Sequence, residues 1–256
     1  MPARIVSLVN QKGGVGKTTS AVSLASGLAR RGQKVLLVDL DAQANATSAL
    51  GLDSRNQIGV YEALLQDSLA QDGIVSVPNE TFSLLPASSA LAGAEVELVP
   101  AMARERRLSV ALEPLRGDYD WILIDCPPSL GLLTINALTA SDSVIIPVQC
   151  EYMALEGLTR LMETLDLVRR NLNPGLTVLG VLLTMFDGRT RLAQQVVDEV
   201  RTHFPQTFAT VIPRAVRLSE APSHGASIFN YEPGGRPANA YEALANELLE
   251  RVEVAA

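Results

Sequence analysis

The segment that most constrains the fold of this chain is a glycine-rich stretch, residues 12–19, between a short apolar run and a helical pattern. It consists of Lys12, Gly13, Gly14, Val15, Gly16, Lys17, Thr18 and Thr19. Glycines allow the backbone to curve until successive N–H groups point inward, and the start of the following helix adds partial positive charge. In such a loop Lys17 would reach the terminal phosphates of a nucleotide, and the Thr18 hydroxyl would ligate Mg²⁺. The segment therefore predicts a strand, a phosphate-binding loop and a helix in direct succession.

Short apolar runs alternate with longer amphipathic stretches along the sequence. The runs are rich in Val, Ile and Leu with little alternation, which is typical of strands covered on both faces. We expect strands at residues 5–9, 35–39, 82–85, 121–125, 144–148, 178–184 and 209–212. We expect helices at residues 18–30, 102–115, 132–140, 155–170, 192–203 and 238–252, with short helices within 53–100. This alternation predicts an α/β fold in which residues 1–256 form a single domain, a mostly parallel twisted sheet flanked by helices.

Composition excludes several other classes of protein. Of the 256 residues 47% are hydrophobic and 19% are charged, so the chain is neither disordered nor a disulfide scaffold. Its formal net charge of −7 excludes a globally basic nucleic-acid binder but leaves a local basic patch open. There are two cysteines, Cys126 and Cys150, and no run reaches the roughly 18 uncharged apolar residues of a membrane-spanning helix. These features indicate a cytoplasmic protein.

Two details separate this loop from the standard phosphate loop. Gln11 stands where the usual pattern has a glycine, and a second lysine, Lys12, stands at the loop entrance. This pattern resembles the deviant Walker A family of ATPases, which includes the ParA, Soj and MinD proteins and the nitrogenase iron protein. The resemblance covers nearly the whole chain and is strongest to the ParA/Soj chromosome-partitioning branch, on four further segments: residues 38–47, 125–129, 147–157 and 212–223.

The resemblance implies catalytic roles for several charged side chains. Lys12 would reach across an ATP-sandwiched dimer to the partner's ATP and place positive charge where the transition state gains negative charge. By the same resemblance Asp41 would orient the attacking water and Asp39 would support it. Both lie at the end of the second predicted strand, where ligands of open α/β sheets bind. Asp125, at the end of another predicted strand, would hold Mg²⁺ through water, and Thr18 would be the other metal ligand.

The resemblance also extends to the base of the nucleotide. Pro213 and Ala215 match a loop on the adenine side of the family's site, although Ala215 replaces the usual asparagine. Backbone contacts to adenine would survive this change, whereas a side-chain contact would not. Ala226 stands where relatives often carry a lysine, which removes one candidate cation from the surface. The implied nucleotide-binding residues are Lys12, Gly13, Gly14, Val15, Gly16, Lys17, Thr18, Thr19, Pro213 and Ala215.

The segment from Asp187 to Arg236 differs in charge from the rest of this acidic chain. It holds six arginines against five acidic residues, so it permits a basic patch without requiring one. Charge alone favours the alternative, solvated arginines at helix ends. The resemblance favours DNA contacts for Arg189 and Arg217, and Arg214 belongs either to that surface or to the nucleotide loop.

The resemblance as a whole implies an ATP-dependent DNA-partitioning switch. ATP and Mg²⁺ would be its cofactors, and a homodimer formed on ATP binding would bind double-stranded DNA non-specifically. A ParB/Spo0J-type protein would stimulate an ATP hydrolysis that is otherwise slow. The protein would be cytoplasmic and nucleoid-associated, without a membrane partner. The alternatives are a MinD-like membrane-associated regulator, which the acidic C-terminal residues 250–256 disfavour, an iron–sulfur reductase that uses Cys126 and Cys150, and a small-molecule kinase.

Overall fold

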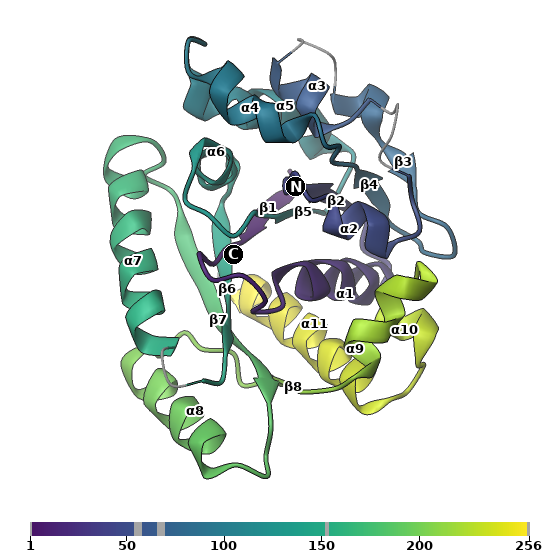
Figure 1. The fold of residues 1–256 in the computed structure, drawn as a ribbon, viewed down its shortest axis with the longest axis vertical. Helices are drawn as coiled ribbons and strands as arrows, with labels where there is room; N and C mark the ends of the chain where they lie inside the picture. Colours follow the sequence, from purple (N-terminus) through teal and green to yellow (C-terminus); the bar gives the residue numbers. More distant parts are fainter. Residues whose placement is uncertain (1, 54–57, 66–69, 152–153, 255–256) are drawn as a thin grey trace.

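A computed structural model describes residues 2–53, 58–65, 70–151 and 154–254. Within these residues the strands form one sheet of eight, in the order β3-β4-β2-β5-β1-β6-β7-β8 (Figure 1). Every neighbouring pair is parallel except β3 with β4. The strands are β1 (Arg4–Leu8), β2 (Val35–Asp39), β3 (Val75–Ser76), β4 (Ser83–Leu85), β5 (Trp121–Asp125), β6 (Ser143–Gln149), β7 (Thr177–Phe186) and β8 (Val211–Pro213).

The central strands are apolar because helices cover both faces of the sheet. Strands β2 and β5 are buried along their whole length. Their pairing sets Asp39 opposite Asp125, and β1, on the other side of β5, sets Leu8 opposite the same residue. The carboxyl ends of three neighbouring parallel strands therefore meet at one edge, where ligands of open α/β sheets bind.

Helices form a layer on each face of the sheet (Figure 1). Helices α3 to α8 contribute to the core on one face, and α1, α2, α9, α10 and α11 lie over the other. Within the described ranges, none of the helices is long and apolar enough to span a membrane. The α-helices are α1 (Lys17–Ala29), α2 (Asn45–Ala49), α3 (Val60–Leu65), α4 (Leu91–Leu98), α5 (Arg107–Leu112), α6 (Leu132–Ala140), α7 (Ala154–Asn171), α8 (Arg191–His203), α9 (Arg217–Glu220), α10 (Ile228–Tyr231) and α11 (Arg236–Val254). Short 3₁₀ segments are η1 (Ala70–Gly73), η2 (Arg104–Arg106), η3 (Glu113–Gly117) and η4 (Ala221–His224).

The predicted α/β class and the mostly parallel sheet are confirmed, with local differences. The short helices α2, α9 and α10 are not predicted, and the strand predicted at residues 209–212 lies at Val211–Pro213. The helix predicted at residues 102–115 is divided into η2, α5 and η3. Ala103, which precedes η2, has a left-handed φ of +49°, and Pro114 in η3 has no N–H to donate, so a continuous helix does not form. Strand β3 is not predicted from the sequence, because two residues carry no periodic signal.

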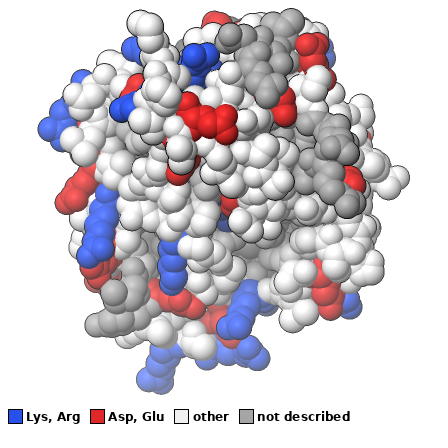
Figure 2. Space-filling model, turned by 45° about the horizontal axis from the view of Figure 1, so that its top comes forward, with Lys and Arg blue, Asp and Glu red and all other residues white. Residues whose placement is uncertain are grey.

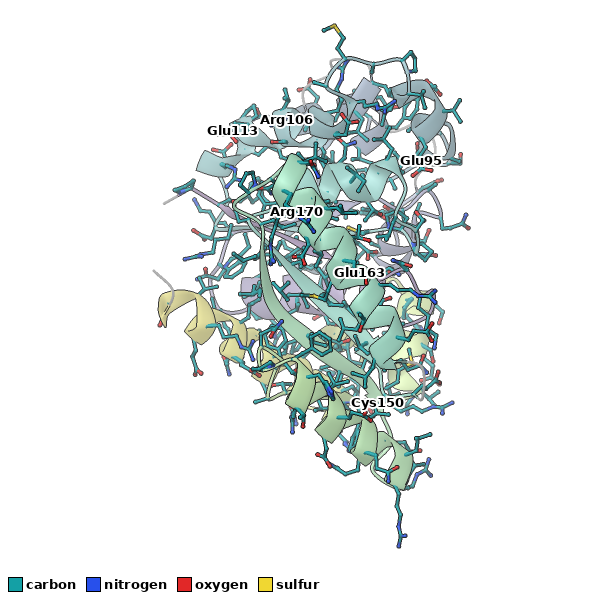
Figure 3. All side chains as sticks on the ribbon, turned by 90° about the vertical axis from the view of Figure 1, so that its left-hand side faces the viewer. Glu95, Arg106, Glu113, Cys150, Glu163 and Arg170 are labelled. Carbon is teal, nitrogen blue, oxygen red and sulfur yellow. The ribbon has the colours of Figure 1, made fainter. Side chains whose placement is uncertain are left out.

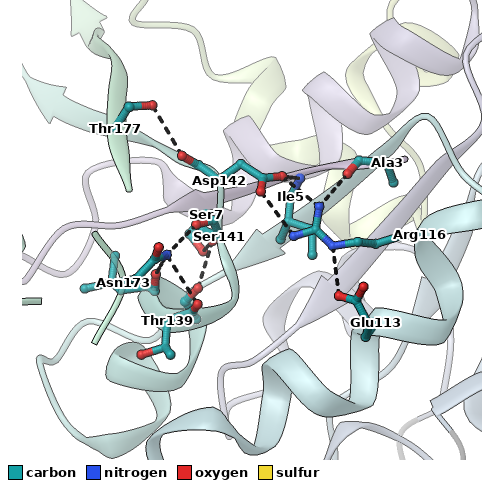
Figure 4. A network of polar contacts seen from close by, with 12 residues as sticks. Ala3, Ile5, Ser7, Glu113, Arg116, Thr139, Ser141, Asp142, Asn173 and Thr177 are labelled. Atoms are coloured by element: carbon teal, nitrogen blue, oxygen red, sulfur yellow. Dashed lines mark hydrogen bonds and ion pairs between the residues drawn. The ribbon is translucent and has the colours of Figure 1, made fainter. Parts of the chain in front are cut away.

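Polar contacts fix the opposite, amino-terminal edge of the sheet (Figure 4). Asp142 accepts a hydrogen bond from the backbone N–H of Ile5 at 2.8 Å and pairs with Arg116 at 3.1 Å. The hydroxyl groups of Ser7 and Ser141 share a buried hydrogen bond of 2.6 Å. These contacts join β1 to the connection between α6 and β6, and so they help to fix the central strands that end at the carboxyl edge.

Candidate functional site

The glycine-rich loop connects β1 to α1 at the carboxyl edge of the sheet. Gly14 and Gly16 have φ angles of +75° and +85°, a left-handed conformation that other residues rarely adopt. Gly16 is also the N-cap of α1 and offers no side-chain cap, so the first N–H groups of the helix are available to an anion. The loop thus has the backbone geometry that phosphate binding requires.

Side chains outside the motif hold this loop in place. Asn10 donates to the carbonyl of Pro147 at 2.7 Å and accepts from the N–H of Lys12 at 2.9 Å, which ties the loop to β6. The Thr184 hydroxyl, on β7, donates to the carbonyl of Val15 at 2.9 Å. Sequence analysis does not identify Asn10 or Thr184, because β6 and β7 meet the loop only in the folded sheet.

Lys17 is a nearly buried ammonium within the loop. The residue is 7% exposed, and its Nζ donates to the Lys12 carbonyl at 3.2 Å. Burial lowers the pKa of Lys17, while the carboxylates of Asp125 and Asp41 act in the opposite direction. Bound phosphates would complete the contacts of such a group. The adjoining cavity of about 300 Å³, which we call the phosphate pocket, is lined by Gly13, Gly14, Gly16, Lys17, Thr18, Thr19, Asp41, Asn45, Pro128 and Met185.

The two aspartates that follow β2 have different surroundings. Asp39 is fully buried, and its Oδ2 accepts hydrogen bonds from the N–H and the hydroxyl of Thr47, both at 2.8 Å. Burial raises the pKa of Asp39 to about 6, although the bonds from Thr47 favour its charged form. Asp41 accepts from the N–H of Gln43 at 3.0 Å and lines the phosphate pocket. Asp41 is therefore the carboxylate at the pocket, and Asp39 holds the neighbouring start of α2.

Asp125 lies at the end of β5 and is fully buried. It is 0% exposed, and neither of its carboxylate oxygens accepts a hydrogen bond within the described part of the chain. Burial, and then the charge of Asp39, raises the pKa of Asp125 well above its ordinary value, against the effects of Thr18 and Lys17. An orphaned buried carboxylate is costly, and a hydrated Mg²⁺ between Asp125 and Thr18 would satisfy it. The residues present therefore fit the metal ion that the sequence predicts.

A second cavity, of about 310 Å³, opens beside the loop, and we call it the base pocket. Gly16 and Thr19 contribute to its wall, together with Pro213 and Ala215 from the end of β8. Its lining is mostly apolar, which suits a flat heterocyclic base. Met185 lines both pockets and has a φ of +54°, which is unusual for a bulky residue. Sequence analysis does not identify Met185, because this conformation leaves no pattern in the sequence.

Lys12 is placed differently from Lys17. Its side chain is 53% exposed, and its Nζ forms an ion pair with Glu151 at 3.1 Å. It is not among the described residues that line the phosphate pocket. One lysine of the loop therefore lies within the phosphate pocket, and the other lies outside it.

The two cysteines are buried. Cys150, labelled in Figure 3, follows β6, and Cys126 follows Asp125. Burial raises the pKa of both thiols, so both are protonated at neutral pH. Protonated, buried thiols are poor metal ligands, and both side chains pack as small apolar groups in the core.

The three arginines that the sequence favours for DNA contact follow β7 and β8. Arg189 binds Asp187 with two side-chain hydrogen bonds of 2.6 and 2.8 Å. Arg217 pairs with Glu220 at 2.8 Å. Arg214 lines the base pocket, and it therefore lies beside the predicted nucleotide site. All three are exposed, but Arg189 and Arg217 each hold a carboxylate of the same chain.

Comparison with known proteins relates this arrangement to a family. A family model described as an AAA domain matches residues 3–178. The sporulation initiation inhibitor protein Soj of Bacillus subtilis is 55% identical over 247 residues, which cover 96% of this chain and 98% of that protein. The chromosome-partitioning ATPase Soj of Thermus thermophilus is 52% identical over 254 residues, which cover 98% of each chain.

Solved structures share the whole fold. The structure of cobyrinic acid a,c-diamide synthase from Mycobacterium smegmatis with bound ADP and magnesium is 38% identical, with a TM-score of 0.87, and covers 99% of this chain and 97% of that one. The septum site-determining protein MinD of Pyrococcus horikoshii, complexed with Mg-ADP, is 30% identical, with a TM-score of 0.79 over 99% of each chain. Fold and site together define a P-loop ATPase of the deviant Walker A class. The chain belongs to the ParA/Soj family of chromosome-partitioning ATPases.

Proposed function

We propose that this chain is an ATP-driven switch that partitions DNA. Two copies bind ATP between them, the dimer holds double-stranded DNA without sequence preference, and a ParB-type protein stimulates a slow, Mg²⁺-dependent hydrolysis. The observation that carries this proposal is the placement of the two lysines, because Lys17 lies in the phosphate pocket while Lys12 is exposed outside it. In the dimer Lys12 contacts the phosphates of the ATP that is bound to the second subunit, and this contact accounts for its position outside the pocket.

Each polar side chain of the site has a distinct role in this proposal. The loop N–H groups and Lys17 bind the β- and γ-phosphates. Thr18 and Asp125 would hold Mg²⁺, and the metal would supply positive charge that offsets the charge developing on the phosphates. Asp41 accepts a hydrogen bond from the attacking water and orients it toward the γ-phosphorus. The base pocket holds adenine by apolar contact and backbone groups.

The relatives support the proposed cofactors and the proposed role in chromosome partitioning. Two Soj proteins share more than half of their residues with this chain, and the similar structures contain ADP with magnesium. A switch that holds chromosomal DNA works in the cytoplasm on the nucleoid, so we place the protein there. Arg189, Arg214 and Arg217 supply its DNA contacts, because phosphate neutralisation by arginine provides affinity without sequence preference.

The substitution Lys12→Ala tests the proposal. ATP affinity should stay within about threefold of wild type because Lys17 is intact, whereas ATP-dependent retention on DNA should be lost because no dimer forms. The matched control is Lys34→Ala, which removes an exposed lysine just before β2, at the amino-terminal edge of the sheet. Fluorescent-nucleotide titration and DNA retention with a non-hydrolysable ATP analogue give the two readouts. Wild-type retention of Lys12→Ala on DNA would remove the trans role of this lysine.

A further inference from the structure

Asn10 stands two residues after β1, at the point where the chain leaves the sheet to form the phosphate loop. The parallel ladder between β1 and β6 ends with a hydrogen bond from the Val9 N–H to the Ile145 carbonyl, at 3.1 Å. A continued ladder would place the next donor at Gln11 and the next acceptor at the Pro147 carbonyl. The Asn10 side chain donates to that carbonyl at 2.7 Å, so it takes the place of the next backbone donor. The main chain can therefore turn into the loop while it stays tied to β6.

The other end of the same amide holds Lys12. Asn10 Oδ1 accepts a hydrogen bond from the Lys12 N–H at 2.9 Å, which closes a turn of the kind that asparagine side chains form two residues ahead. The Lys12 carbonyl in turn accepts from Lys17 Nζ at 3.2 Å. Asn10 is 7% exposed, and both ends of its amide are bonded. The peptide groups before and after Lys12 are therefore both held, and they set the direction in which its side chain leaves the loop.

The side chain of Lys12 is held less firmly than its main chain. A lysine has a flexible four-carbon stem, and the ion pair with Glu151 is 53% exposed on both sides. Exposed acidic and basic side chains are interspersed on the face shown in Figure 2, and ion pairs in such surroundings contribute little to stability. A Cβ added at Gly14 would meet nothing within 4 Å, so packing does not hold the loop after Lys12 either. The bond from Asn10 thus fixes the starting point of a flexible side chain.

We infer that Asn10 is a positioning residue for Lys12, which directs the ammonium of this lysine toward the nucleotide of the second subunit. This inference rests on the proposed function and adds a residue to its machinery. A cation offsets the charge of a transition state only where it is correctly placed, and a displacement of about 1 Å can cost about a hundredfold in rate. Asn10 is not among the described residues that line the phosphate pocket. Its loss should therefore affect assembly and hydrolysis more than ATP binding by a single chain.

The two hydrogen bonds of Asn10 require an amide. Donation to Pro147 needs an N–H and acceptance from Lys12 needs an oxygen, and an asparagine side chain carries both. Asn10→Ala removes both bonds. Asn10→Ser keeps an acceptor for the Lys12 N–H, since a serine hydroxyl closes the same kind of turn more weakly, but it is too short to reach Pro147 as well. The two variants therefore remove the contact in steps.

Both variants are compared with Asn173→Ala. The Asn173 amide also donates to neighbouring carbonyls, those of Leu138 and Ser141, but it lies at the amino-terminal edge of the sheet (Figure 4). Titration of the full chain with a fluorescent ATP analogue measures nucleotide affinity. Phosphate release at saturating ATP and Mg²⁺ measures kcat. Light scattering over a range of protein concentrations, with each variant combined with Asp41→Ala and loaded with ATP and Mg²⁺, measures the dissociation constant of the dimer.

Asn10→Ala should bind ATP within about threefold of wild type, because Lys17 and the loop N–H groups remain. Its kcat should fall, and its dimer should weaken, by roughly tenfold or more, because Lys12 is no longer correctly placed. Asn10→Ser should lie between Asn10→Ala and wild type, and Asn173→Ala should match wild type in all three measurements. Lys12→Ala should release phosphate at the same rate with and without Asn10→Ala, because Asn10 acts through this lysine.

Several outcomes overturn the inference. A fall in ATP affinity as large as the fall in kcat, in both Asn10 variants, would mean that Asn10 shapes the phosphate loop itself. A further loss of rate when Asn10→Ala is added to Lys12→Ala would mean that Asn10 does not act through the lysine. Wild-type dimerisation and turnover in Asn10→Ala would show that Lys12 is positioned without it. If Lys12→Ala itself dimerises and hydrolyses ATP as wild type does, the proposed role of this lysine fails first, and the inference fails with it.

Discussion

At the residue scale, the site contains two carboxyl groups that are buried, although burial disfavours their charged form. Asp39 and Asp125 are both 0% exposed, and burial raises the pKa of each. Asp39 is compensated by hydrogen bonds from Thr47, whereas Asp125 has no hydrogen-bond partner among the described residues. This difference separates a structural carboxylate from one that is suited to a metal ion.

Asp125→Asn should separate metal binding from folding. For wild type, Mg²⁺ added to ATP should raise the unfolding temperature, because a ligand that binds the folded state stabilises it. The variant should lose this rise. Without nucleotide and metal it should be as stable as wild type or more stable, because burial of an unsatisfied charge costs about 1–3 kcal/mol or more. Thermal unfolding beside the exposed control Asp118→Asn checks this, and a Mg²⁺-dependent rise that persists in Asp125→Asn would refute the metal role.

The raised pKa of Asp39 predicts that the free energy of unfolding depends on pH, and it fixes the sign of that dependence. Its pKa is raised from 3.8 to about 6 in the folded protein, while the unfolded chain has the ordinary value. The folded state therefore binds more protons between these values, so the free energy of unfolding falls as pH rises through the folded pKa. The loss contributed by Asp39 is at most about 3 kcal/mol.

Urea unfolding without nucleotide or Mg²⁺, at about pH 5 and about pH 7.5, measures this effect against Asp39→Asn. The stability of wild type should fall relative to that of the variant as pH rises. An equal pH dependence of the two proteins would show that the Asp39 carboxyl does not titrate in this range.

The elements differ in how well the sequence predicts them. Strands β2 and β5 and helix α6 have the predicted bounds, and both strands are continuous apolar runs, which carry a strong local signal. The break before α5 and the short β3 depend on single backbone conformations and on tertiary pairing, which local patterns do not encode. The same limit applies to the site. The motif identifies the loop and the resemblance adds Asp125. Thr184 and Met185 lie on β7, which reaches the loop only after folding, and Asn10 contacts β6 only in the folded sheet.

Strand β7 contains a glycine whose replacement should disturb packing. A Cβ at Gly180 would overlap the Phe208 ring and approach the Arg251 guanidinium. Phe208 is fully buried, and the Arg251 guanidinium lies 4.1 Å from its ring centre, so the ring has little room to move. Gly180→Ala should therefore reduce the free energy of unfolding by about 1–3 kcal/mol.

Gly117→Ala is the matched control for this prediction, since nothing lies within 4 Å of the Cβ added there. Urea denaturation of both variants measures the difference in their free energies of unfolding. Equal stability of the two would mean that the contact between β7 and Phe208 relaxes without cost.

At the scale of the whole molecule, the acidic protein concentrates arginines beyond the carboxyl ends of β7 and β8, next to the base pocket. Arg214 lines the base pocket and is one of the proposed DNA contacts, so the nucleotide site and the proposed DNA surface share a residue. The proposed function gives two exposed features, the ammonium of Lys12 and these arginines, partners on other molecules, in exchange for exposed ion pairs such as that of Lys12 with Glu151. Assembly on ATP is therefore the central claim for the whole molecule.

The Asp41→Ala variant should still form the ATP-dependent dimer but should not hydrolyse ATP. ATP should still bind, because the loop and Lys17 are intact, and phosphate release should fall by roughly a hundredfold or more, since the attacking water is no longer oriented. A phosphate-release assay at saturating ATP and Mg²⁺ measures this change. Normal turnover would show that Asp41 does not position the water.

The molar mass of Asp41→Ala, measured by light scattering after gel filtration, shows whether two chains assemble on ATP. One chain has a mass of 27.3 kDa. With ATP and Mg²⁺ we expect twice this mass. With ADP and Mg²⁺, or with Lys12→Ala added to the variant, we expect the mass of a single chain. A protein that binds ATP yet keeps the mass of one chain, or that dimerises equally with ADP, would contradict an ATP-dependent dimer in which Lys12 acts on the partner's nucleotide.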